Sequence, residues 1–360
     1  MAVGEPTRRL QEIGQSVWLD GVSRPLLVSG ALSRFLAELS VTGLGFNQDV
    51  FEHTVLSGNA YDASIQALAA AGLSEEEQFF ELALEDLTQA GELLRPIFDA
   101  TGGKEGWASL AISPLLADNT AQTIRAASHL HSKAALANLF VQVPGTPEGV
   151  RAIEEIVFDG IPVDVALLFS QEHYLAAAQA YMRGLERRSA AGLTVDVESV
   201  ASIAVSPWDV MVKEEVSSPV HNRLGIAMAM RTYRAYRELL ASARWRALEA
   251  VGATPQRLMW VGTGTNDATH SGAPYVEALV ADATINCMPR ETLVAFVQHG
   301  VPGQPLPIDG GYADAVLEEF RREGVDDAAL AERLQRAGVE HASTAWHAML
   351  SLIREKGLRS

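Results

Sequence analysis

The sequence predicts a (β/α)8 barrel, or TIM barrel, with additional helices, and three observations lead to this fold. Eight short, mostly apolar and β-rich runs recur along the 360 residues, as expected for parallel strands covered by helices. Segments with helical periodicity separate these runs. No Pro-, Gly- or Ser-rich linker and no internal repeat divides the chain, so we expect a single barrel domain over residues 1–360.

The eight expected strands set the positions at which a site is to be sought. Chemistry in such barrels is located at the carboxyl ends of the strands and in the loops that follow them. The strands are expected at residues 16–20, 41–47, 107–113, 139–144, 163–169, 201–206, 258–263 and 284–289.

Helices are expected between the strands and at both edges of the barrel. Residues 147–156 carry a proline near their start, and residues 171–188 follow Ser170, a suitable N-cap, and end in two arginines. The stretch after Phe51 is too long for one crossover, which predicts a helical insertion at about 51–105. Residues 313–323 and 328–337 predict a helical C-terminal extension at about 312–356.

The composition restricts the partners of this chain. Its net charge of −17 argues against a nucleic acid or an anionic membrane, so a small-molecule substrate is expected. No apolar run reaches the ~18 residues of a membrane span, and a cytoplasmic protein is expected. The single cysteine, Cys287, excludes an internal disulfide and a cysteine-rich zinc site. The excess of arginine and alanine over four lysines suggests a bacterial source, and a homodimer stays open.

The expected fourth strand carries the most informative residue. Residues 138–146 read Asn-Leu-Phe-Val-Gln-Val-Pro-Gly-Thr. This segment resembles the fourth barrel strand of the transaldolases, which reads like Asn-Leu-Phe-Ile-Lys-Ile-Pro-Ala-Thr. In that family the lysine forms a Schiff base with the ketose donor. The resemblance places Gln142 at this position, and a carboxamide cannot condense with a carbonyl.

The resemblance extends from about Ser16 to about Leu352 and is closest to the longer bacterial and plastid-type branch. It implies that Asp20 is the proton-transfer aspartate of strand one and that Asn47 is the asparagine kept from a Thr-Thr-Asn-Pro pattern. The segments that carry it are 16–20, 40–44, 51–53, 61–62, 260–265, 275–277 and 286–289.

Other positions depart from the family pattern. On strand five an asparagine becomes Asp164, and the glutamate and threonine that hold a catalytic water become Ala111 and Ala166. Two basic residues near the substrate phosphate become Pro207 and Asn266. These changes predict a less polar pocket that binds a less phosphorylated substrate.

Asp20 and Asp164 are therefore the expected catalytic pair. Burial and mutual repulsion should raise the pKa of at least one of them, as suits acid–base catalysis. No cofactor is expected, because residues 262–265 lack the dinucleotide fingerprint. No metal is expected, because no histidine or cysteine spacing supports one. The expected substrate-binding residues are Asn47, Phe46, Gln142, Ser206 and Trp208.

Several residues have simpler structural interpretations. Asp49 precedes an apolar pair and suits a helix cap, and Cys287 suits a buried small hydrophobe. His53 and His270 are expected in a helix or a loop.

Three hypotheses for function follow. The preferred one is a barrel that has lost Schiff-base chemistry and catalyses a cofactor-free isomerase, cyclase or lyase reaction in bacterial specialised metabolism. The second is a non-catalytic relative that binds a metabolite or a partner. The third is residual transaldolase activity, which trapping with borohydride and fructose 6-phosphate would reveal.

Overall fold

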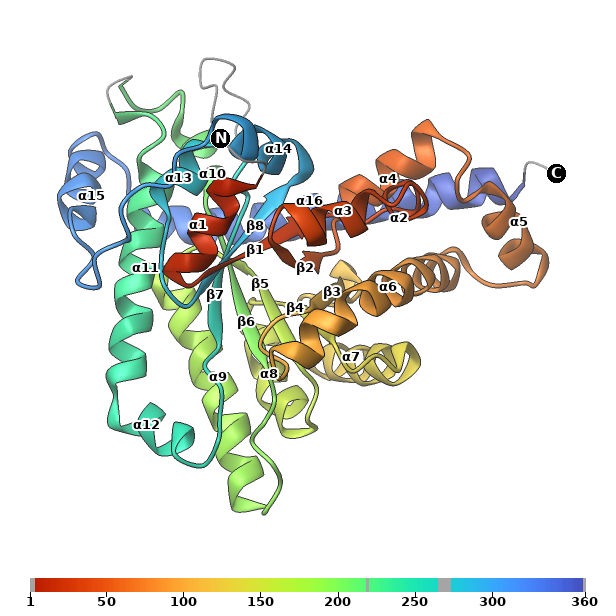
Figure 1. Ribbon diagram of the computed structural model, residues 1–360, viewed down its shortest axis with the longest axis horizontal. Helices are drawn as coiled ribbons and strands as arrows, with labels where there is room; N and C mark the ends of the chain where they lie inside the picture. The colour runs from red at the N-terminus through yellow and green to blue at the C-terminus, as the bar shows by residue number, and fades with distance from the viewer. Residues whose placement is uncertain (1–3, 218–219, 265–272, 359–360) are drawn as a thin grey trace.

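The computed structural model describes residues 4–217, 220–264 and 273–358. Within them, eight parallel strands close into a barrel in the order β1 to β8, which confirms the predicted (β/α)8 fold (Figure 1). The strands are β1 Gln15–Asp20, β2 Val41–Gly45, β3 Trp107–Ala111, β4 Leu139–Pro144, β5 Val163–Leu168, β6 Ser199–Ala204, β7 Arg257–Val261 and β8 Thr284–Pro289.

Helices surround the barrel and extend it. Those of the first half are α1 Glu5–Ile13, α2 Arg24–Val28, α3 Ala31–Glu38, α4 Gln48–Ser57, α5 Asp62–Ala70, α6 Glu75–Ala100, the 3-10 turn η1 Pro114–Leu116 and α7 Thr120–Ala134. Those of the second half are α8 Pro147–Phe158, α9 Gln171–Ala190, α10 Ser206–Val212, α11 Leu224–Ala241, α12 Ala243–Glu249, α13 Pro274–Ala278, α14 Arg290–His299, α15 Ala313–Arg322 and α16 Asp327–Gly357. Among the described helices, none is long and apolar enough to cross a membrane.

The barrel interior is filled by large side chains, so it is a packed core and not a pore. Trp18, Trp107 and Phe140 belong to one buried cluster, in which the rings of Trp107 and Phe140 stack at 4.2 Å. Gly43 faces the Trp18 indole, and a Cβ built there would lie 2.2 Å from the ring. Only glycine therefore lets β2 pack beside this tryptophan. Cys287 lies in the same cluster, buried as a small apolar side chain.

The long C-terminal helix α16 crosses the barrel mouth. It contacts β5 and η1 near the barrel and α4, α5 and α6 beyond it, as Figure 1 shows for its far end. Gln335 fixes its start, because its buried amide Nε2 donates to the carbonyls of Gly145 and Leu167, both at 2.9 Å. Lys356 fixes its end through the Gly58 carbonyl and the Asp62 carboxylate. The helix thus forms a fixed cover over the carboxyl ends of the strands.

Candidate active site at the barrel mouth

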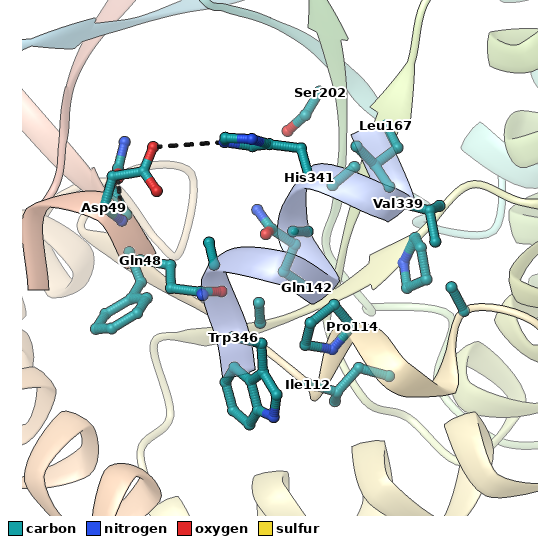
Figure 2. Close-up of a pocket in the computed structure, with 18 of the residues that line it drawn as sticks. Gln48, Asp49, Ile112, Pro114, Gln142, Leu167, Ser202, Val339, His341 and Trp346 are labelled. Carbon is teal, nitrogen blue, oxygen red and sulfur yellow. Dashed lines mark hydrogen bonds and ion pairs between the residues drawn. The ribbon is translucent and has the colours of Figure 1, made fainter. Parts of the chain in front are cut away.

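A cavity of about 320 Å³ lies at the carboxyl ends of the strands. We call it the mouth cavity. Its floor is formed by residues at the ends of six strands and its cover by α16, which contributes Val339, His341, Ala342, Ala345 and Trp346. Figure 2 shows His341 and Asp49 facing each other across it, with Nε2 and Oδ2 4.0 Å apart. The strand residues are Asp20, Ala111, Gln142, Ala166, Ala204 and Val261.

Asp20 is the last residue of β1 and borders the mouth cavity. Gly21 follows it with φ 97°, and a Cβ on this glycine would lie 2.8 Å from Val50, so the sharp turn requires glycine. Removal of water by the surrounding protein raises the pKa of Asp20 to about 6, and the charges of Asp49 and Asp164 add to the rise. The carboxyl can therefore gain and lose a proton near neutral pH.

Asn47 holds the Asp20 carboxylate. Its Oδ1 caps α4 by accepting from the amides of Asp49 and Val50, which leaves Nδ2 to donate to Asp20 Oδ2 at 3.0 Å. The bond favours the charged carboxylate and lowers the pKa of Asp20, in opposition to burial. The expectation that Asp49 caps this helix was wrong, because Asn47 occupies the N-cap and Asp49 lies in the first turn.

Asp164 lies beneath the cavity floor and does not line the cavity. It is fully buried and accepts hydrogen bonds from Ser202 Oγ at 2.6 Å, Gln142 Nε2 at 2.7 Å and Ser109 Oγ at 2.8 Å. Burial raises its pKa, and the three donors act against that rise. Asp164 therefore reaches the cavity only through Gln142 and Ser202, which do line it.

The remaining predicted binding residues divide into two groups. Phe46 lines the cavity and packs edge-on against Phe79, at 5.6 Å between ring centroids. Trp208 does not line it, because α10 turns the indole inward, where Nε1 donates to the Phe169 carbonyl at 3.1 Å. Ser206 lies beside Gly262, also outside the cavity. His270 and Asn266 lie outside the described residues.

A lysine amine can form a Schiff base with a carbonyl substrate, so the positions of the lysines relative to the cavity matter. All four lie in the described part of the chain, and none lines the mouth cavity. Lys133 pairs with Glu81 at 2.8 Å, and Lys356 holds the end of α16. Lys104 and Lys213 are exposed, before β3 and after α10.

Within the described residues, no cluster of histidine, cysteine and acidic side chains has the arrangement of a metal site. Asp209, an acidic residue of α10, does not line the mouth cavity, and it accepts hydrogen bonds from the Leu224 and Gly225 amides and from the Tyr275 hydroxyl. The mouth cavity thus offers the Asp20 carboxyl for proton transfer, amide and hydroxyl groups, and a mostly apolar cover.

The fold and the position of the cavity define a TIM-barrel protein whose site lies at the carboxyl ends of the barrel strands. The family model described as Transaldolase/Fructose-6-phosphate aldolase matches residues 17–353, so the chain belongs to this family. It is 38% identical to a transaldolase of Thiobacillus denitrificans, covering 96% of this chain and 99% of that protein. It is 35% identical to a transaldolase of Thermobifida fusca, covering 98% and 99%.

These matches overturn the hypothesis of a barrel turned to an unrelated acid–base reaction. Relatives named transaldolase align over nearly the whole chain at 33–38% identity, which points to the third hypothesis instead. That hypothesis rested on a few positions at the ends of several strands, whereas identity spread over the chain reports common ancestry of the entire site scaffold.

Proposed function

We propose that this chain catalyses aldol-type transfer of a carbon fragment between small phosphorylated sugars, the reaction class for which its full-length relatives are named. The observation that carries this proposal is the Asp20–Asn47 pair, whose carboxyl has a pKa of about 6 at the mouth cavity. Such a group suits proton exchange with a sugar hydroxyl. A bacterial source and a cytoplasmic location, both expected from the sequence, are further parts of the proposal, as is a homodimer, which the sequence left open.

Each half-reaction needs one proton transfer at a hydroxyl. In the cleavage of a ketose phosphate, the C3–C4 bond breaks and its electrons move toward the carbonyl at C2. The C4 hydroxyl loses its proton to Asp20 and becomes an aldehyde. In the second half-reaction the acceptor aldehyde forms the new bond, and Asp20 returns the proton to the new hydroxyl. Asp20 ends as it began, so protons and electrons balance.

Gln142 is proposed to occupy the position where the family resemblance expects the imine-forming lysine. Its Nε2 carries two hydrogens, and Asp164 accepts one of them. The second is directed to the substrate carbonyl oxygen, where it stabilises the negative charge that develops during cleavage. Asp164 then acts as a positioning residue that fixes the rotamer of this amide. A direct test of the overall proposal is release of a three-carbon aldose phosphate from fructose 6-phosphate by the wild-type protein.

The pH dependence of turnover should report Asp20. The charged form accepts the proton, and its pKa is raised to about 6, so kcat/KM should fall as the pH drops below 6. Below that midpoint the decline approaches tenfold per pH unit. The Asp49→Asn variant should move the midpoint lower, because the Asp49 charge raises the pKa of Asp20. Rates measured from pH 4.5 to 8 check this, and a midpoint near 4 in the wild type would contradict the assignment.

Replacing Gln142 by lysine should create a covalent trapping site. A lysine amine here would lie beside Asp164 and face the mouth cavity. With fructose 6-phosphate and borohydride, we expect an adduct on residue 142 in Gln142→Lys, and none in the wild type or in Gln142→Met, a variant of similar length without an amine. Peptide mapping by mass spectrometry reads the result. An adduct on any of the four native lysines would show that the amine comes from elsewhere in the chain.

A further inference from the structure

The hydroxyl of Ser202 connects a buried acid to the mouth cavity. Ser202 lies on β6 and lines the cavity, where Figure 2 shows it with Gln142. Its Oγ lies 2.6 Å from Oδ1 of Asp164, and this hydroxyl has no further hydrogen-bond partner among the described residues. A serine hydroxyl can donate its hydrogen and accept another at the same time. Ser202 can therefore receive a proton from Asp164 and give its own to a molecule in the cavity.

The two oxygens of the Asp164 carboxyl are not equivalent. Oδ2 accepts from both Gln142 Nε2 and Ser109 Oγ, whereas Oδ1 has Ser202 alone as its partner. Two donors favour the unprotonated oxygen at Oδ2, so a proton on this carboxyl is held by Oδ1. The protonated Oδ1 then donates to Ser202 Oγ, and the hydrogen of Ser202 is directed into the cavity.

The surroundings of Asp164 favour its protonated form. Burial is the largest influence on its pKa and raises it, and the three side chains bonded to it are all neutral. The charges of Asp164 and Asp20 repel each other, so an ionised Asp20 opposes a second charge nearby. Cys287, which is also coupled to both acids, is a buried thiol with a raised pKa and stays neutral. Two carboxyls in such unequal surroundings can supply a base and an acid to one reaction.

We propose that Ser202 is a further catalytic residue, which passes the proton of Asp164 to the carbonyl oxygen of the substrate. This inference rests on the proposed function, because that oxygen belongs to the ketose cleaved in the mouth cavity. Gln142 cannot replace Ser202 in this step, because a carboxamide donates hydrogen bonds without titrating. Both side chains are bonded to one carboxyl, so the amide can hold the oxygen to which the serine gives its proton.

The proton path balances in both half-reactions. As the C3–C4 bond of the ketose breaks, Asp20 takes the proton of the C4 hydroxyl, and the electrons of the broken bond form a double bond between C2 and C3. The C2 oxygen takes the Ser202 proton, and Ser202 takes the proton of Asp164. The retained fragment is then a neutral enediol. When the enediol attacks the acceptor aldehyde, its proton returns through Ser202 to Asp164, and Asp20 protonates the new hydroxyl.

Two serines bonded to the same carboxyl provide a matched pair of variants. Ser109 is buried and donates to Asp164 at 2.8 Å, but it does not line the cavity. Ser202→Ala should lower kcat with fructose 6-phosphate by about 10²-fold and change KM far less, because it interrupts the proton path. The loss in Ser109→Ala should be at least about tenfold smaller. Equal losses in the two variants would overturn the proposal, because each removes one hydrogen bond to Asp164.

A double variant separates proton relay from independent effects. In the Asp164→Asn background, Ser202→Ala should lower kcat little further, because the proton that it relays is already absent. A loss equal to the product of the two single losses would overturn the relay. Urea unfolding of the two serine variants, side by side, checks that both fold.

Infrared spectroscopy at pH 7 detects the proton on Asp164 without any turnover and separates this inference from the proposed function. We expect a band of a protonated carboxyl in the wild type that is absent in Asp164→Asn. The band together with no cleavage of fructose 6-phosphate would contradict the proposed function and support Asp164 as the proton store. Cleavage without the band would overturn the relay and leave the proposed function intact. Absence of both would contradict both.

Discussion

Replacing Asp20 by asparagine should lower kcat by about 10²–10⁴-fold, the range that general acid–base groups contribute. The amide keeps the size of the side chain, but it neither accepts the C4 hydroxyl proton nor returns it. Substrate contacts change little, so KM should move far less than kcat. Steady-state kinetics with fructose 6-phosphate measures both quantities. A variant with wild-type kcat would remove Asp20 from the reaction.

The same variant should be more stable than the wild type at high pH, which separates lost chemistry from lost folding. The folded-state pKa of Asp20 is about 6, above the ordinary value of 3.8. The wild type therefore loses stability as the pH rises from the lower value through the higher one, because the unfolded chain ionises first. Asparagine has no such loss. Urea unfolding at pH 8 should show a gain of up to about 3 kcal/mol for Asp20→Asn, and none at pH 3.5.

Replacing Asp164 by alanine should destabilise the protein by about 2–4 kcal/mol, because it leaves buried donors without an acceptor. Ser109 and Ser202 are both buried and donate to this carboxyl, and Gln142 donates from the cavity side. Alanine also leaves an empty space in a packed barrel. The free energy of urea unfolding measures the effect.

Asp164→Asn is the matched variant, since it keeps the volume and one acceptor oxygen. It should cost less stability than Asp164→Ala, while kcat falls in both because the Gln142 amide loses its fixed orientation. If Asp164→Ala unfolded within about 0.5 kcal/mol of the wild type, the buried network could not be a source of stability.

The fold could be predicted from the sequence because strand patterns and helix caps each depend on only a few neighbouring residues. The bounds of β4 and β8 match the expected runs, and Ser170 caps α9 by accepting from the His173 amide at 3.2 Å. Other strands differ by a few residues. For example, β6 ends at Ala204 and not at Ser206, because Ser206 begins α10 with a proline at the next position.

The cover of the site was not predictable, because it depends on packing between distant segments. The sequence predicted a mostly helical extension at about 312–356, with one helix at 328–337. In the structure α16 continues through Gly338 to Gly357, and a Cβ at Gly338 would lie 2.9 Å from the Leu167 side chain. The glycine thus permits close approach to β5 and is not a terminator. His341 and Trp346 reach the site only through this crossing.

Within the site, Asp20, Asn47, Phe46 and Gln142 were predicted to meet, and they do. Ser109 and Ser202 were missed, because a lone serine in an apolar strand gives no sequence signal. Trp208 was expected to line the substrate pocket, since it follows the end of β6 closely in the sequence. The direction of a side chain in a short helix after a strand depends on the turn between them, which the sequence pattern does not specify.

The most direct test of the account is transfer of an isotope label. Wild-type protein is incubated with fructose 6-phosphate labelled with ¹³C at C1 to C3 and an unlabelled aldose phosphate acceptor, and the products are followed by NMR. We expect the three labelled carbons to appear together in a new ketose phosphate, and to remain in fructose 6-phosphate when Asp20 is replaced by asparagine. Label that stays in the donor with the wild-type protein would contradict aldol-type transfer.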